Sequence, residues 1–244
     1  MRVAVLSIGH RPVRAGGRDW ASGPAVHVTE LAAALAHLGH DVRVYTRRSS
    51  PSQPEQSRDP AGVTTVSVPV GPPRATPPDE EADQVTAFGQ WLDRSWRQGW
   101  APDVVHAHGW PSALSALVAK SLASRPTVVT SPPIDAGLGH RDLIEQATRG
   151  ADALVALSRG DAHILRRLGV PAAKVSVIPS GVDTEQFAPD GRAWARRRSP
   201  RCRTCRTPSS SSWAGRHRRR TGWGRTPPRC ARSPSTTPSM TGSA

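Results

Sequence analysis

The sequence predicts an α/β domain built on a parallel β-sheet over residues 1–190, followed by a basic tail over residues 191–244 that stays disordered. Three observations support this. Short runs of branched apolar residues alternate with longer segments whose apolar residues recur every three or four positions. Strands that alternate with helices favour right-handed β-α-β units and hence a parallel sheet. The composition then changes abruptly at Gly191.

Each predicted element follows from its local pattern. Strands are expected at Val3–Ile8, Val42–Tyr45, Val63–Val70, Asp103–His106, Thr127–Thr130, Ala153–Leu157 and Lys174–Ile178. Helices are expected at Val26–Leu38, Glu80–Gln98, Pro111–Ser124, Arg141–Gly150 and Arg159–Leu168. Gly39 suits the end of the first helix, and Pro111 suits a first helical turn. Arg47–Gly62 is rich in Ser, Pro and Gln and is expected to be a loop.

Ligands of such sheets bind beyond the carboxyl ends of the strands. This rule singles out four loops: Gly9–Gly23, His106–Trp110, Ser131–Gly139 and Pro179–Asp183. The first brings a glycine turn to the start of a helix, where free backbone N–H groups attract phosphate, although a plain helix start explains it as well. In the second, an imidazole can donate to a sugar hydroxyl or a phosphate and Trp110 can stack on a sugar. The alternative, given equal weight, is a histidine at the end of a strand whose ring only hydrogen-bonds to the backbone.

Four segments, taken together in order and spacing, resemble a known family. They are Leu31–Tyr45 with its Gly39-His40, Asp103–Trp110, Ala151–Ser158 and Pro179–Phe187. They resemble the N-terminal half of retaining GT-B glycosyltransferases, the class of sucrose-synthase-like and mannosyltransferase-like enzymes. The resemblance covers roughly residues 1–190. It implies a Rossmann-like domain, and an enzyme that moves a sugar from a nucleotide-sugar donor to an acceptor hydroxyl with retention, without a metal or cofactor.

The resemblance also implies roles for single residues. His108 matches the histidine that lies near the reacting sugar and is the catalytic candidate. Gly23 matches one of two glycines that let the backbone approach the donor phosphate, and the other position here is Ser22. Trp110 and Arg141 are the expected contacts of the acceptor or the sugar, although Arg141 and Glu145 are spaced like a plain surface ion pair.

Two features depart from the family, and one alternative reaction stays open. After the strand at Thr127–Thr130, many members carry a histidine where this chain has Ser131-Pro132-Pro133. A nucleotide-sugar epimerase of the same two-domain architecture is the alternative enzyme. The family's second domain, which holds most of the donor site, has no counterpart in residues 191–244 as written, so the chain is expected to be truncated and inactive alone.

The tail carries the whole net charge. Fourteen of the 33 basic residues are arginines after Asp190, and all 19 acidic residues lie before it, so the first 190 residues are neutral and the tail is +14. With no aliphatic residue beyond Ala and Met240, it is expected to be disordered. A nonspecific nucleic-acid-binding arm is one explanation. A zinc site is another, with its candidate ligands Cys202, Cys205, His217 and Cys230.

The favoured explanation is that the tail is out-of-frame translation of a GC-rich gene. When the reading frame is shifted by one base, the codons of Trp213-Ala214 give glycine without any choice. The codons of Arg219–Gly224 permit Lys-Asp-Gly-Val-Gly, and the last glycine is again forced. An apolar strand, Gly-Arg, and then Lys and Gly resemble the opening of the family's second domain. No specific nucleic-acid partner is therefore expected.

The expected location is the cytoplasm. No apolar run approaches the roughly 20 residues needed to span a bilayer, and Met1–Ile8 has no signal-peptide pattern. All three cysteines lie in the tail, so nothing in the predicted domain asks for an oxidising compartment. Peripheral contact with a membrane surface is left open.

Overall fold

The computed structural model describes residues 1–9, 23–75, 80–131, 141–181 and 184. The chain divides into a unit from Met1 to Asp183 and a unit from Thr184 to Ala244. All described helices and strands belong to the first unit. The predicted tail and large parts of the Gly9–Gly23 and Ser131–Gly139 loops lie outside the described residues, so the predictions made for them stay predictions.

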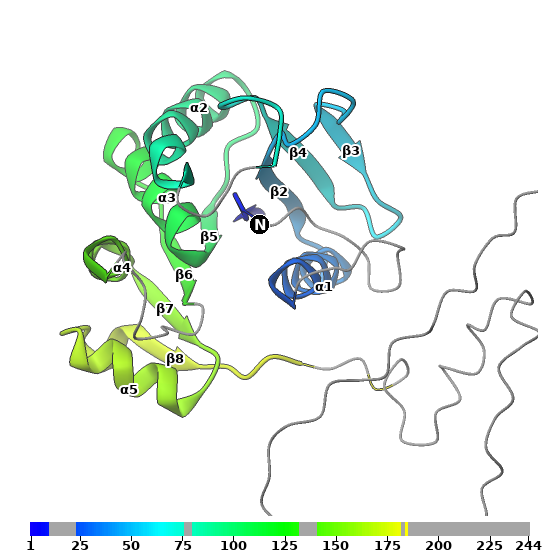
Figure 1. Cartoon of the computed structure of the whole chain (residues 1–244). Coiled ribbons are helices and arrows are strands. Elements are labelled where there is room, and N and C mark those ends of the chain that lie inside the picture. The colour runs from blue at the N-terminus through cyan, green and yellow to red at the C-terminus, as the bar shows by residue number, and fades with distance from the viewer. Residues whose placement is uncertain (10–22, 76–79, 132–140, 182–183, 185–244) are drawn as a thin grey trace, which may run out of the picture. The chain divides into compact units, whose positions relative to one another are not determined.

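One eight-stranded sheet organises the described part of the chain (Figure 1), in the order β3-β4-β2-β1-β5-β6-β7-β8. Its strands are β1 (Arg2–Leu6), β2 (Asp41–Arg47), β3 (Gln56–Arg58), β4 (Thr64–Val68), β5 (Val104–His108), β6 (Thr127–Ser131), β7 (Ala153–Ala156) and β8 (Val175–Val177). Neighbouring strands are parallel except β3, which runs antiparallel to β4. The predicted Rossmann-like parallel sheet is confirmed. The loop predicted at Arg47–Gly62 is partly wrong, because it contains β3.

Five α-helices connect the parallel strands within the described ranges. They are α1 (Gly23–His37), α2 (Val85–Gln98), α3 (Gly109–Leu122), α4 (Arg141–Gly150) and α5 (Arg159–Arg167), with short 3-10 turns η2 (Ala82–Gln84) and η3 (Ala172–Lys174). The end of α1 follows the predicted pattern. Gly39 has a φ of 85°, in the left-handed region that favours glycine, and its N–H donates to the carbonyl of Ala36.

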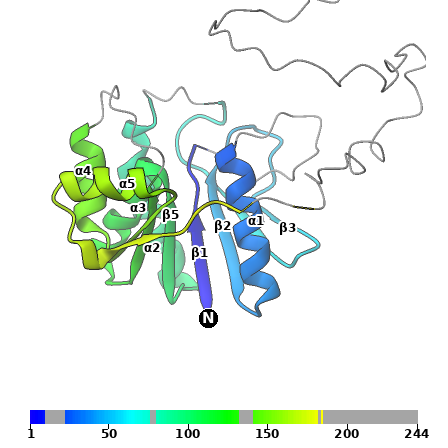
Figure 2. The same ribbon diagram turned by 90° about the horizontal axis from the view of Figure 1, so that it is seen from below.

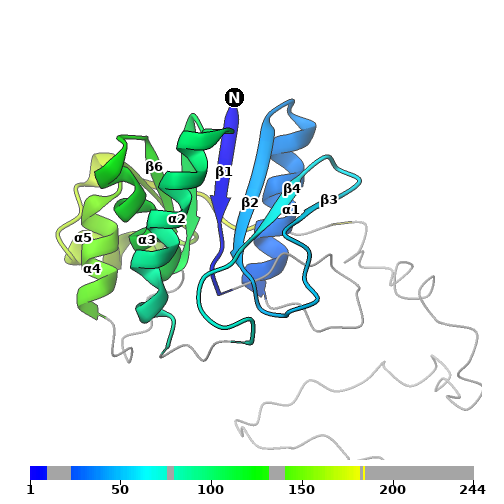
Figure 3. The same cartoon turned by 90° about the horizontal axis from the view of Figure 1, so that it is seen from above.

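The two faces of the sheet are covered unequally. On one face, Val28 and Ala32 of α1 pack against Val3 and Val5 of β1 and Val44 of β2. On the other face, buried residues of α2, α3, α4 and α5 share one larger cluster. Figure 2 and Figure 3 show α1 separated from α3 by strands β1 and β2. The larger cluster holds most of the fully buried side chains, each contributing about 1.5–3 kcal/mol when removed from water.

Candidate functional site

Three histidines meet at the carboxyl end of β5. His106 and His108 alternate with Val105 and Ala107, which belong to the cluster beneath α3, so both histidine side chains point to the face that α1 covers. Their rings stack with centroids 4.6 Å apart and planes 28° apart. The ring of His27, from α1, contacts the His108 ring edge-on at 5.4 Å and 62°.

The strand continues further than the sequence indicates. The predicted strand ends at His106 and a loop is expected through Trp110, but β5 runs through His108 and α3 begins at Gly109. A φ of 77° at Gly109 makes this sharp passage from strand to helix, a conformation that glycine adopts without steric cost. His108 is therefore the last residue of its strand and directly precedes the helix, and the sheet register fixes its backbone.

The imidazoles of the cluster are neutral at pH 7. Burial, and secondarily the charge of His27, lowers the pKa of His106 to about 4. Burial, followed by the charges of His106 and His27, holds the pKa of His108 well below its ordinary value of 6.5. Burial also lowers the pKa of His27. A neutral imidazole offers one N–H donor and one bare nitrogen acceptor, so the cluster provides directional hydrogen bonds rather than positive charge.

Two ring nitrogens of this cluster differ in their hydrogen bonds. His106 Nε2 lies 2.7 Å from Oγ1 of Thr130, a buried residue of β6. His108 Nε2 is also buried, but no group of the described residues lies within hydrogen-bond reach of it. Buried polar atoms without partners are rare and call for an explanation. The atom lies at the carboxyl end of β5, the end of the sheet at which ligands bind in this architecture.

Gly23 is the first residue of α1 and is exposed. Its φ lies outside the left-handed region, and a Cβ added to it would meet nothing within 4 Å. The domain itself therefore does not require glycine at this position. The predicted approach of a donor phosphate to Gly23 stays a prediction, and Ser22 lies outside the described residues. Gly23 begins the same helix that carries His27.

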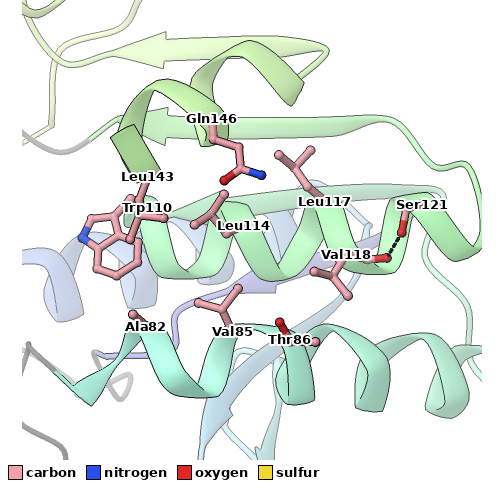
Figure 4. A pocket seen from close by; sticks show the side chains of 10 residues that line it. All are labelled: Ala82, Val85, Thr86, Trp110, Leu114, Leu117, Val118, Ser121, Leu143 and Gln146. Atoms are coloured by element: carbon pink, nitrogen blue, oxygen red, sulfur yellow. Dashed lines mark hydrogen bonds between the residues drawn. The ribbon is translucent and has the colours of Figure 1, made fainter. Parts of the chain in front are cut away.

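Trp110 does not join the histidines. It is the second residue of α3 and borders a groove of about 370 Å³ between α2, α3 and α4 (Figure 4), on the sheet face opposite His108. The groove is mainly apolar and is lined by Ala82, Val85, Thr86, Trp110, Leu114, Leu117, Val118, Ser121, Leu143 and Gln146. The predicted sugar contact of Trp110 stays a prediction, but it would involve a different face from that of His108.

Arg141 begins α4, and its side chain is 76% exposed. Its Nε lies 3.2 Å from Oε1 of Glu145, and Arg149 pairs with the same carboxylate at 3.3 Å. This is the surface ion pair that the spacing of Arg141 and Glu145 allows. Its predicted contact with the acceptor or the sugar stays a prediction.

Sequence reasoning missed His27 and Thr130. His27 lies inside a helix whose pattern gives no sign of its neighbours, and Thr130 reaches His106 through the pairing of β5 with β6. Within the described ranges, no three His, Cys, Asp or Glu side chains are grouped so that they could hold a metal ion. The same part of the chain contains no helix of the length and apolar character needed to cross a bilayer.

Comparison with known proteins agrees with this fold. A family model described as a glycosyl transferase 4-like domain matches residues 22–181. The D-inositol 3-phosphate glycosyltransferase of Xylanimonas cellulosilytica is 33% identical over 205 residues, 77% of this chain and 49% of the relative. The enzyme of the same name from Kribbella flavida is 34% identical over 212 residues, 80% of this chain and 50% of the relative. The chain thus spans about half the length of these curated relatives.

Solved structures share the architecture. Sucrose-phosphate synthase from Thermosynechococcus elongatus has a TM-score of 0.69 at 20% identity, covering 80% of this chain and 52% of that one. HepE from Anabaena, in complex with UDP-glucose, has a TM-score of 0.51 at 15% identity and covers 80% and 49%. These likenesses confirm that the described domain has the fold of the N-terminal half of GT-B enzymes. By the match over residues 22–181, the chain belongs to the glycosyltransferases with a glycosyl transferase 4-like domain.

Proposed function

We propose that this chain supplies the acceptor-side half of an enzyme that transfers a sugar from a nucleotide-sugar donor to an acceptor hydroxyl with retention. The observation that carries the proposal is the neutral histidine cluster at the carboxyl end of β5, with the unpartnered Nε2 of His108. The family membership and the UDP-glucose held by the structural neighbour HepE support it. The donor and acceptor would meet in a cleft of which this domain forms one wall.

His108 is the proposed catalytic residue. As a neutral imidazole it would exchange a hydrogen bond with a sugar hydroxyl near the reacting carbon, and it would not act as a cation. A contact that strengthens in the transition state lowers kcat by about 10²–10³-fold when it is lost. Gly23 would let the backbone approach the diphosphate or the transferred sugar. No metal or cofactor is proposed, since basic side chains and helix N-termini meet the leaving charge in this class.

The acceptor is proposed from the relatives. The two curated enzymes compared above bear the name D-inositol 3-phosphate glycosyltransferase, so a phosphorylated cyclitol is the first acceptor to test. The cytoplasm, where nucleotide sugars and such acceptors are both available, is the proposed location. A nucleotide-sugar epimerase of the same architecture is the competing enzyme, and it would release an epimerised sugar and free nucleotide instead of a glycoside.

We also propose that residues 191–244 are read out of frame and that this 244-residue chain is inactive by itself. Positioning two substrates supplies a large share of the acceleration in such reactions, and residues 1–190 provide one wall of the cleft. Sequencing the gene across the codons for Asp190 to Arg201 tests the frame directly. If the sequenced gene has one continuous reading frame across these codons, the proposal that the tail is out of frame is wrong.

The activity test compares two proteins. The 244-residue chain and the product of the frame-corrected gene are each incubated with UDP-glucose and D-inositol 3-phosphate, and the anomeric configuration of the product is read by NMR. The corrected protein is expected to form an α-linked product from the α-linked donor, and the 244-residue chain none. Turnover by the 244-residue chain contradicts the assignment of the tail. Epimerised free sugar without a glycoside favours the competing enzyme.

A further inference from the structure

We propose that Thr130 and His106 are positioning residues for His108. In this arrangement the Thr130 hydroxyl decides which nitrogen of His106 carries the proton, and the His106 ring, fixed in this way, holds the ring of His108 in place. The inference rests on the proposed function for the importance of His108. Its structural content concerns the protein alone and can be tested without any substrate.

The proton assignment follows from the hydrogen bond between β5 and β6. Thr130 is 4% exposed, and the partner of its hydroxyl is Nε2 of His106 at 2.7 Å. A hydroxyl carries one proton that needs an acceptor, and a neutral imidazole has one nitrogen with a proton and one without. If Nε2 carried the proton, the Thr130 hydroxyl oxygen would accept the hydrogen bond from Nε2–H. Its own proton would then have no acceptor among the described residues.

The opposite orientation satisfies the buried donor. When the Thr130 hydroxyl donates to Nε2, that nitrogen is bare and the proton of His106 sits on Nδ1. The Nδ1–H that this orientation creates is not orphaned in turn, because Nδ1 of His106 is not among the buried atoms of the described residues that lack a partner. Buried donors in folded proteins are rarely left without an acceptor, so this orientation is the favoured one. The geometry therefore assigns the Nδ1–H tautomer to His106. The low pKa of His106, about 4, agrees with an uncharged ring that accepts a hydrogen bond at neutral pH.

The His106 ring then constrains His108 from one side. The two residues are alternate positions of β5, which is held in register between β1 and β6. Their rings stack at 4.6 Å, and the His27 ring contacts His108 at 5.4 Å. The His108 ring is thus flanked by two rings, with its Nε2 buried and free of any partner among the described groups.

The test reads proton positions by NMR. Long-range ¹H–¹⁵N correlation spectra of the full 244-residue chain with ¹⁵N-labelled histidine distinguish Nδ1–H from Nε2–H rings, and the spectrum of His106→Gln identifies the His106 signals. At pH 7.5, His106 is expected to show the Nδ1–H pattern. Thr130→Val, which keeps the shape and removes the hydroxyl, is expected to shift His106 toward Nε2–H and to move the His108 ring signals. Thr130→Ser is expected to restore the wild-type pattern.

A matched control lies on the same strand. The hydroxyl of Thr127 is also on a buried residue of β6, but it donates to the carbonyl of Arg125, so Thr127→Val is expected to leave the His106 pattern unchanged. An Nε2–H pattern in the wild-type chain overturns the proposal. This test needs no variant, so it can be carried out even if Thr130→Val does not fold. Unchanged His106 and His108 signals in a folded Thr130→Val protein overturn it as well.

The two proposals fail separately. A wild-type Nδ1–H pattern that depends on Thr130, found in a protein whose frame-corrected form transfers no sugar, supports the positioning network and removes the proposed function. Sugar transfer by the frame-corrected protein, together with an Nε2–H pattern at His106, removes the positioning network and leaves the proposed function in place.

Discussion

Mild acid is expected to destabilise this domain through its half-buried histidine cluster. His106 is neutral when folded because burial lowers its pKa to about 4, whereas in the unfolded chain its pKa is the ordinary 6.5. Between these two values the unfolded chain binds a proton that the folded chain does not. The free energy of unfolding therefore falls as the pH drops below 6.5, and it continues to fall until the pH approaches 4.

The magnitude follows from the size of this window. One pH unit below the unfolded pKa is worth about 1.4 kcal/mol for a group that stays neutral in the folded state. At pH 5.5, His106 alone therefore lowers the free energy of unfolding by about 1.4 kcal/mol relative to pH 7.5. His108 and His27 add to this loss, because burial shifts the pKa of each in the same direction. The carboxyl groups with shifted pKa values, Asp103 and Asp152, titrate at lower pH and do not contribute here.

The assay is urea unfolding followed by far-UV circular dichroism at pH 7.5 and pH 5.5. His106→Gln removes the titrating group and keeps an amide oxygen that can accept from the Thr130 hydroxyl. The wild-type protein is expected to lose about 1.4 kcal/mol more than His106→Gln between the two pH values. His163→Gln, at an exposed position of α5, is the matched control and is expected to behave as the wild type. Equal losses in wild type and His106→Gln would refute the reasoning.

Four further outcomes are expected. Gly89→Ala would place a methyl group 2.6 Å from the backbone oxygen of Ser115, so α2 and α3 must separate and the protein should lose about 1–3 kcal/mol in urea unfolding. Gly23→Ala, with open space around it, should change stability by less than about 0.5 kcal/mol. Ser158→Ala removes the side chain that caps α5 and should cost about 1 kcal/mol, most of which Ser158→Thr should restore, because a hydroxyl both accepts from the N–H of Asp161 and donates to its carboxylate. Amides of residues 191–244 should exchange within the dead time of a hydrogen-exchange experiment, and slow exchange there would contradict the predicted disorder.

The sequence predicts the parallel sheet well because buried strands and amphipathic helices leave a periodic apolar pattern. All seven predicted strands and all five predicted helices appear in the described residues. The pattern fails at β3, Gln56–Arg58, where every side chain is polar and exposed and pairing with β4 alone defines the strand. It also ends β5 too early, because the polar rings of His106 and His108 interrupt the apolar run although the backbone stays paired.

The candidate site is predicted in part. His108 is found by its match to the family's motif, but its neighbours come from packing that a single sequence does not encode locally. His27 reaches it because α1 lies over that face, and Thr130 reaches His106 because β5 and β6 pair in one particular register. Trp110 shows that residues close in sequence can also be separated in space. It is two residues from His108, yet the passage from strand to helix turns it to the other face.

The unequal covering of the sheet has a consequence for local unfolding. Helix α1 buries three small or medium side chains, Ala25, Val28 and Ala32, whereas α3 buries seven residues. A helix held by so little apolar surface opens at a lower free energy than the domain unfolds. Detachment of α1 would withdraw His27 and admit water to the stacked rings while the sheet and the larger cluster stay intact. Native-state hydrogen exchange should then show the amides of α1 exchanging before those of α3, as a separate cooperative unit.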